Sequence, residues 1–120
     1  MANELTIQTT AQYTKNGATF NRTPASFTIT VAGDNVQAGI VSVGTSPEAI
    51  PLGDIATPGY LLVHNLDATN YIQIGYDATG FKPTVKVAAG KWGIFQLDPT
   101  VPQWQANTGA CLVEFRLFPV

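Results

Sequence analysis

The chain has 120 residues, of which 45% are hydrophobic, and a formal net charge of −2 at pH 7. This length supports one domain with a hydrophobic core and is short for two, so we expect a single domain over residues 1–120. Only 12% of the residues are charged, about half of the ~25% that is typical of soluble domains, which favours a protein that lies packed against other proteins. The six lysines and arginines form no cluster that could neutralise a phosphate backbone, so nucleic-acid binding is not expected.

The sequence also argues against membrane insertion, secretion and a disulfide. No apolar run approaches the roughly 20 residues needed to cross a bilayer. The first ten residues carry an acid where a secretory signal has bases, so we expect a chain that is made and kept soluble. Cys111 is the only cysteine, and it alternates with Val113 and Phe115. We therefore expect it to be a small buried side chain, with a reactive or intermolecular thiol as the alternative.

Apolar and polar residues alternate with period two along the chain, while helical spacing is absent, which predicts an all-β fold. Residues 1–14 are rich in Thr and Gln and contribute little to a core. They are expected to form either an edge strand, which we prefer, or an arm that pairs with a neighbouring subunit. Asn16 and Gly17 then carry the signature of a type I′ hairpin turn, in which both central residues have positive φ. The strands expected after this turn are ASFTITVAG, GIVSVG, YLLVHNL, YIQIGYD, TVKVA, WGIFQL and ACLVEFRLF.

Turn signals separate these segments and predict about eight to ten short strands. Pro58 and Gly59, for example, suit the central positions of a type II turn. This spacing predicts an antiparallel β-sandwich, with a jelly roll as the most natural case. Residues 98–109 hold two prolines and Trp104 and are expected to form a long loop, of the kind that usually binds or covers something.

This long loop supplies the candidate binding residues. We expect Trp104 to be partly exposed, with Gln103 and Gln105 beside it as further partner-binding residues, and Trp92 to lie near the core. Trp104 is then interpreted as an anchor in a protein interface. Stacking against a carbohydrate and simple plugging of the loop are the alternatives.

Catalytic chemistry finds little support in the residues. Nucleophilic catalysis needs a nucleophile, a base and an orienting group, but no serine stands in a G-x-S-x-G turn and the only histidine, His64, ends a predicted strand. The segment NLDATN offers closely spaced oxygens for calcium, yet its spacing does not match an EF-hand loop, and no phosphate-binding glycine motif occurs. We therefore expect no enzyme activity, no bound metal and no cofactor.

Three segments of the second half carry a resemblance to known proteins. YLLVHNLDATNYIQIGYD is followed by a glycine-led turn in AAGKWGIFQL and by a closing ACLVEFRLF. In this order of segments the chain, over roughly residues 60–118, resembles small structural proteins of tailed bacteriophages. Proteins of this kind are β-sandwiches, commonly jelly-roll or immunoglobulin-like, and several are capsid decoration or cement proteins that sit as trimers on the capsid. The chain departs from them at Lys91, where they have an acid.

The resemblance implies a virion structural protein that is assembled in the host cytoplasm. On this basis we expect the chain to bind and stabilise the lattice of the major capsid protein as a homotrimer on the capsid surface. The resemblance also implies structural roles, in holding a loop or turning the chain, for Asn65, Asp67, Thr69, Asn70, Gly75 and Gly90. A tail, baseplate or head-fibre component would share the same fold, as would a carbohydrate-binding module, so these remain alternative functions.

Overall fold

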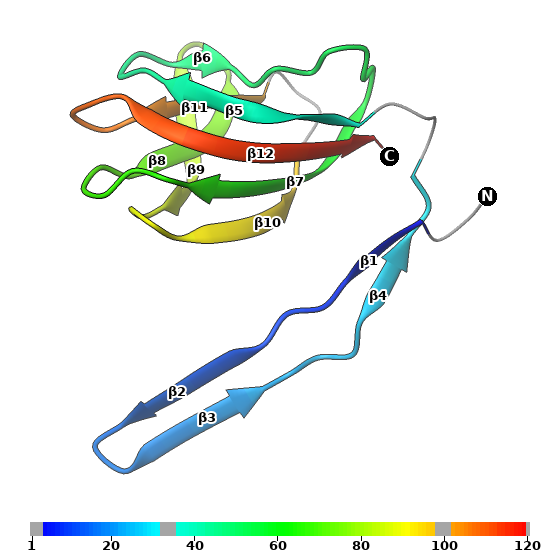
Figure 1. Cartoon of the computed structure of the whole chain (residues 1–120), viewed down its shortest axis with the longest axis vertical. Helices are drawn as coiled ribbons and strands as arrows, with labels where there is room; N and C mark the ends of the chain where they lie inside the picture. The colour runs from blue at the N-terminus through cyan, green and yellow to red at the C-terminus, as the bar shows by residue number, and fades with distance from the viewer. Residues whose placement is uncertain (1–3, 32–35, 98–101, 120) are drawn as a thin grey trace. The chain divides into compact units, whose positions relative to one another are not determined.

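A computed structural model describes residues 4–31, 36–97 and 102–119, and in these residues the chain is all-β (Figure 1). The chain divides into two compact units, Met1–Ala32 and Gly33–Val120. We expected one sandwich over the whole chain, but the described strands of the first unit pair only with one another. They also supply few buried side chains, which explains why they add nothing to a sandwich sheet.

The first unit is a long two-stranded hairpin, residues 4–31, called the arm below. Its strands are β1 (Leu5–Ile7), β2 (Ala11–Lys15), β3 (Ala18–Arg22) and β4 (Phe27–Ile29). β1 pairs antiparallel with β4, and β2 with β3, so the expectation of a sandwich edge strand in residues 1–14 is wrong. Asn16 and Gly17 at the tip have φ of 51° and 83°, which confirms the predicted hairpin turn.

The outer part of the arm has strand pairing without a core. Every residue of β2 and β3 is exposed. Tyr13 and Phe20 lie opposite each other in the register and are 52% and 53% exposed. A two-stranded hairpin with no further layer is only marginally stable in water. Strand pairing by itself therefore gives this part of the arm little stability.

The second unit is a sandwich of two four-stranded antiparallel sheets (Figure 1). Its described strands are β5 (Gln37–Val43), β6 (Glu48–Ala49), β7 (Pro58–Asn65), β8 (Ile72–Asp77), β9 (Phe81–Val87), β10 (Trp92–Gln96), β11 (Pro102–Ala106) and β12 (Cys111–Pro119). The front sheet has the order β10-β7-β12-β5, and the back sheet has the order β6-β11-β8-β9. The predicted all-β antiparallel sandwich is thus confirmed.

The strands of the sandwich pair in a nested order. β5 pairs with β12, β6 with β11, β7 with β10, and β8 with β9, all antiparallel. These four pairs are those of one long hairpin, in which β5 to β8 run against β9 to β12. The further pairs β7–β12 and β8–β11 fold this hairpin over into two sheets. We interpret this order as jelly-roll-like.

The core fills the space between the two sheets with alternate residues of each strand. In β12 the buried and exposed residues alternate from Cys111 onwards, as the period-two pattern predicted. Cys111 is fully buried, and burial raises the pKa of its thiol above the ordinary value of 9.0. The thiol therefore stays protonated and unreactive at neutral pH, in agreement with the expected small buried side chain.

The interpretation of residues 98–109 as one long loop is wrong in its central part. Pro102–Ala106 form β11, an inner strand of the back sheet, whereas residues 98–101 lie outside the described residues. Trp104 is completely buried, and its ring meets that of Phe115 edge-on, with 5.5 Å between centroids and an angle of 85°. A proline is tolerated at the first residue of a strand, so Pro102 did not rule out a strand here.

Gly75 lies inside β8 and not in a turn. The register of β8 with β9 shifts between Ile74 and Gly75. A Cβ atom at Gly75 would collide with the backbone of Lys82 and Pro83. The glycine is thus explained by the close approach of two strands at a β-bulge, and not by the turning role that we expected.

Candidate functional site

The solvent exposure of the two tryptophans is the reverse of what the sequence predicted. Trp104 is 0% exposed, so the prediction that it anchors a partner is wrong, because a buried indole cannot reach one. Gln103 and Gln105, its predicted companions, are half-buried on the opposite face of β11. Trp92, expected near the core, is 65% exposed. In β10 the residue that packs against the core is Phe95, so alternation turns Trp92 outward.

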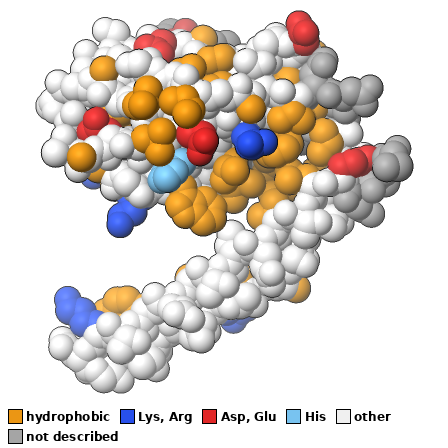
Figure 2. Space-filling model, in the orientation of Figure 1, with side chains coloured by type: hydrophobic (Ala, Val, Ile, Leu, Met, Phe, Trp, Pro, Cys, Tyr) orange, Lys and Arg blue, Asp and Glu red, His pale blue; other side chains and the backbone are white. Residues whose placement is uncertain are grey.

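The outward side of the front sheet, called the front face below, combines apolar and charged side chains. The register aligns one row across all four strands: Trp92, His64, Glu114 and Ile40. The next row is Ile94, Leu62, Arg116 and Ala38. Ile40 and Leu112 are 56% and 50% exposed on the same face. Figure 2 shows hydrophobic side chains around the single histidine, with acidic and basic side chains beside it.

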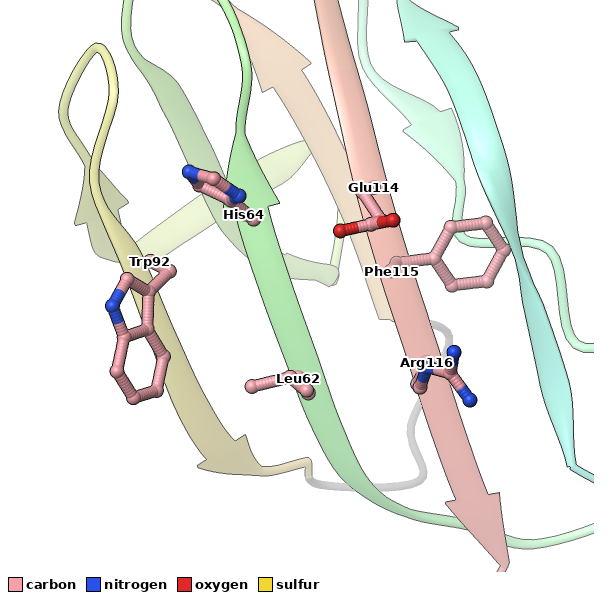
Figure 3. A pocket seen from close by; sticks show the side chains of 6 residues that line it. All are labelled: Leu62, His64, Trp92, Glu114, Phe115 and Arg116. Atoms are coloured by element: carbon pink, nitrogen blue, oxygen red, sulfur yellow. The ribbon is translucent and has the colours of Figure 1, made fainter.

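An open depression of about 350 Å³ lies on the front face (Figure 3). Its lining residues are Leu62, His64, Trp92, Glu114, Phe115 and Arg116. In Figure 3 the side chain of Trp92 comes from β10, those of Leu62 and His64 from β7, and those of Glu114 and Arg116 from β12. Phe115 is buried and points to the other side of the sheet. Three adjacent strands therefore shape one surface around the exposed indole.

The chemistry of this depression fits recognition of another molecule. Trp and Arg are the side chains most enriched among residues that dominate binding energy in protein interfaces. Glu114 and Arg116 place opposite charges two residues apart on β12, where they can fix the orientation of a partner. None of the lining residues is a serine or cysteine that His64 could activate. The described residues also contain no group of three or more His, Cys, Asp or Glu that could hold a metal ion.

The outward side of the back sheet has a different character. Gln105, Gln73 and Lys86 lie side by side in one row across β11, β8 and β9. The Lys86 ammonium lies 4.2 Å from the centre of the Tyr71 ring, a cation–π contact. This row presents two amides and a cation paired with an aromatic ring, all of which water solvates well. The front face is therefore the better candidate for a binding surface.

At the end of the sandwich, the NLDATN loop is held by the buried side chain of Asn65. Its Nδ2 donates to the backbone oxygens of Asn70 and Val87, at 2.9 and 3.2 Å, and its Oδ1 accepts from the amide of Asp67 at 3.0 Å. Asn65 is 0% exposed, and these bonds satisfy both ends of its amide group. The side chain thus joins the end of β7 to its own loop and to the end of β9.

The backbone of Asn65 fixes the following turn as well. Its N–H donates to the oxygen of Lys91 at 2.9 Å, and its oxygen accepts from the N–H of Gly90 at 3.1 Å. Gly90 has a φ of 73°, and the amide of Lys91 closes the turn onto Ala88 at 3.0 Å. A positive φ at the third position of a turn favours glycine.

Asp67 organises the loop from the outside. Its Oδ2 accepts from the amides of Asn70 and Thr69, at 2.6 and 3.0 Å, and from the Thr69 hydroxyl at 3.3 Å. The bond to the Asn70 amide, followed by that to the Thr69 amide, lowers the pKa of Asp67 below its ordinary value of 3.8. Because this oxygen accepts three hydrogen bonds from its own loop, the arrangement is that of a capped turn.

Asp67→Asn is expected to lower stability modestly at neutral pH, because the amide keeps an acceptor but loses the charge that the two N–H groups favour. A carboxyl whose folded pKa is depressed stabilises the fold above its unfolded pKa, and this contribution disappears as the pH falls through the folded pKa. The difference between the wild-type chain and the variant should therefore be constant above about pH 5 and vanish in stronger acid. Urea titrations across this pH range measure it, and a difference that persists in strong acid would contradict this account.

Comparisons of the chain with protein family models, with curated proteins and with solved structures gave no match. No helix in the described part of the chain has the length and apolar character needed to cross a membrane. The features that bear on function are therefore the front face, the arm and the resemblance of the second half. Sequence reasoning missed the front face, although the charges of Glu114 and Arg116 between the buried residues of β12 were a signal for it.

Proposed function

We propose that the protein is a structural component of a tailed-phage virion. In this proposal it is a decoration or cement protein that binds the lattice of the major capsid protein as a homotrimer. The observation that carries the proposal is the front face, where Trp92 is 65% exposed beside an open depression on a regular sheet. Exposed apolar patches with a polar rim are typical of protein interaction sites. The resemblance of residues 60–118 to phage structural proteins supports the choice of partner.

The front face has the parts that a cement protein needs. Trp92 supplies a large apolar anchor, and Glu114 and Arg116 supply charges that select one orientation of the partner. A ligand that binds only the assembled lattice stabilises that lattice by mass action. Three linked copies bind together far more tightly than one, because the second and third contacts form within the same complex. A modest contact through each front face is then sufficient.

The first experiment is the copy number of the chain in purified particles of the phage that encodes it, measured by quantitative mass spectrometry against the major capsid protein. Hundreds of copies per particle are the expected result and support a place on the capsid lattice. A handful of copies would point to the tail, baseplate or head fibre instead. Absence from the particle would overturn the virion proposal.

A second experiment tests the front face directly. Trp92→Ala is expected to weaken binding of the purified chain to shells of the major capsid protein by roughly tenfold or more, because it removes the exposed anchor. Gln73→Ala, on the outward side of the back sheet, is the matched control and should bind as the wild-type chain does. Sedimentation of the chain with shells measures both. Equal binding by all three chains would remove the front face from the proposal.

Carbohydrate binding is the second candidate, and the same tryptophan now favours it. Trp104, the original reason for considering sugar, is buried, but Trp92 presents an exposed ring beside the polar groups of His64 and Glu114. Ligand sites commonly combine an aromatic surface with a few placed polar groups. A glycan array with wild-type and Trp92→Ala chains distinguishes the candidates, since binding lost in the variant would favour carbohydrate and no binding at all would dismiss it.

A further inference from the structure

The edge strands of the sandwich differ in how well they are protected from pairing with another chain. In the back sheet, β9 carries Lys82, Pro83 and Lys86 and has a shifted register, and β6 is only two residues long. Charges, proline, bulges and short length are the usual ways of blocking an edge. The back sheet is therefore closed to strand addition at both of its edges.

The front sheet has a long unprotected edge in β5. This strand has seven residues, QAGIVSV, with no charge and no proline, whereas β10 at the other edge has five residues. β5 pairs with β12 over all seven positions without a register shift, so its free edge is regular. Ala38, Gly39 and Ile40 are exposed, and Ile40 is 56% exposed. A long, regular, uncharged edge is a template for an added strand.

The arm is a strand pair that lacks a neighbour. β2 and β3 are paired with each other and consist of exposed residues, and each has a second edge that no described strand occupies. Charges occur only at their ends, at Lys15 and Arg22. Docking such a hairpin on a sheet edge would extend the sheet, bury part of the Tyr13 and Phe20 rings and remove the instability of an isolated two-stranded ribbon. The arm thus supplies what the β5 edge can accept.

We propose that the β5 edge is a strand-addition site that receives the arm of a second copy of this chain. The proposal rests on the proposed function, because it supplies the contact that holds the homotrimer together. The donor and the acceptor are different surfaces, so each copy gives one arm and receives one. Such a head-to-tail contact forms a ring where the rotation between copies closes, as a homotrimer requires, and an open filament where it does not. Symmetric pairing of β5 with β5 would use one surface twice and would produce dimers.

Three variants separate the parts of this contact. Ile40→Lys puts a charge on the β5 edge, and because Ile40 is largely exposed the fold should tolerate it. Leu112→Lys is the matched control, since Leu112 is 50% exposed on the same sheet face but on the inner strand β12. The double variant Tyr13→Thr and Phe20→Thr keeps β-forming residues in the arm and removes its aromatic pair. Thermal unfolding of each full-length chain checks that it is folded.

Sedimentation velocity of the full-length chains gives the test. The wild-type chain and Leu112→Lys should be trimers, whereas Ile40→Lys and the arm variant should associate at least roughly tenfold more weakly. A mixture of Ile40→Lys and the arm variant should form a one-to-one complex, because the intact arm of Ile40→Lys fits the intact β5 edge of the arm variant. A monomeric wild-type chain, a trimeric Ile40→Lys, equal damage by Leu112→Lys, or a mixture without complex would each overturn the proposal.

The outcome is separate from that of the proposed function. A monomeric wild-type chain that is abundant in virions would overturn the arm contact and leave the capsid role intact. A trimer that is held by the arm and the β5 edge but is absent from virions would support the arm contact and overturn the capsid role.

Discussion

Trp104→Ala is expected to lower the free energy of unfolding by about 3–5 kcal/mol, the usual cost of deleting a large buried aromatic side chain. Trp104 heads the fully buried side chains ranked by volume, and it stands on β11 between β6 and β8. Its removal leaves a cavity between the sheets and takes away the edge-on contact with Phe115. Urea unfolding followed by far-ultraviolet circular dichroism measures the loss.

Trp92→Ala is the matched control, because it makes the same chemical change at a residue that is 65% exposed. Its cost should lie within about 0.5 kcal/mol. Trp104→Phe is a further comparison: the indole Nε1 has no acceptor among the described residues, so a phenyl ring removes a buried unpaired donor and fills most of the space. It should cost clearly less than Trp104→Ala. Equal costs for the two alanine variants would mean that the burial of Trp104 is wrongly assigned.

The two tryptophans also show what period-two alternation can and cannot predict. Alternation separates the two faces of a strand, and it correctly grouped Cys111 with Val113 and Phe115. It does not say which face lies against the second sheet, because that depends on strands distant in sequence. For β10 the core contact is made by Phe95, and for β11 it is made by Trp104. Tryptophan is large and apolar in both positions, so residue type could not decide between them.

The local features of the fold were predictable and the nonlocal ones were not. The Asn16–Gly17 turn requires only the φ preferences of two residues, and the alternating segments require only their own side chains. The nested pairing, by contrast, brings β5 beside β12 across most of the sandwich sequence. The bulge at Gly75 arises from the approach of Lys82 and Pro83 on another strand. No pattern within β8 alone could reveal that contact.

The NLDATN loop combines a local feature, which the sequence could predict, with a nonlocal one, which it could not. A turn built by Asp67 and Thr69 is a local feature, and the sequence predicted its structural character. The burial of Asn65 depends on Val87, which lies 22 residues away, and on the turn at Gly90. The sequence therefore identified Asn65 as structural without identifying its partners on β9 and in the following turn.

Asn65→Asp is expected to lower the free energy of unfolding by roughly 2–4 kcal/mol at neutral pH, because the side chain loses two donated hydrogen bonds inside the core. Asn65 donates through Nδ2 to the oxygens of Asn70 and Val87. An ionised carboxylate only accepts, so it would face two carbonyl oxygens while buried. Both effects raise the pKa of the new carboxyl in the folded state, and the loss should shrink as the pH falls through that pKa, where the protonated acid can donate again.

Asn107→Asp is the matched control, since it makes the same change at a side chain that accepts. The Oδ1 atom of Asn107 accepts from the Tyr71 amide at 3.0 Å, and a carboxylate oxygen can take its place. Its cost should stay below about 1 kcal/mol. Urea midpoints of both variants from neutral to acidic pH give the comparison. A large, pH-dependent loss only in Asn65→Asp would identify donation to Asn70 and Val87 as the interaction that holds this end of the sandwich, whereas equal losses would show that the loop tolerates no charge at either position.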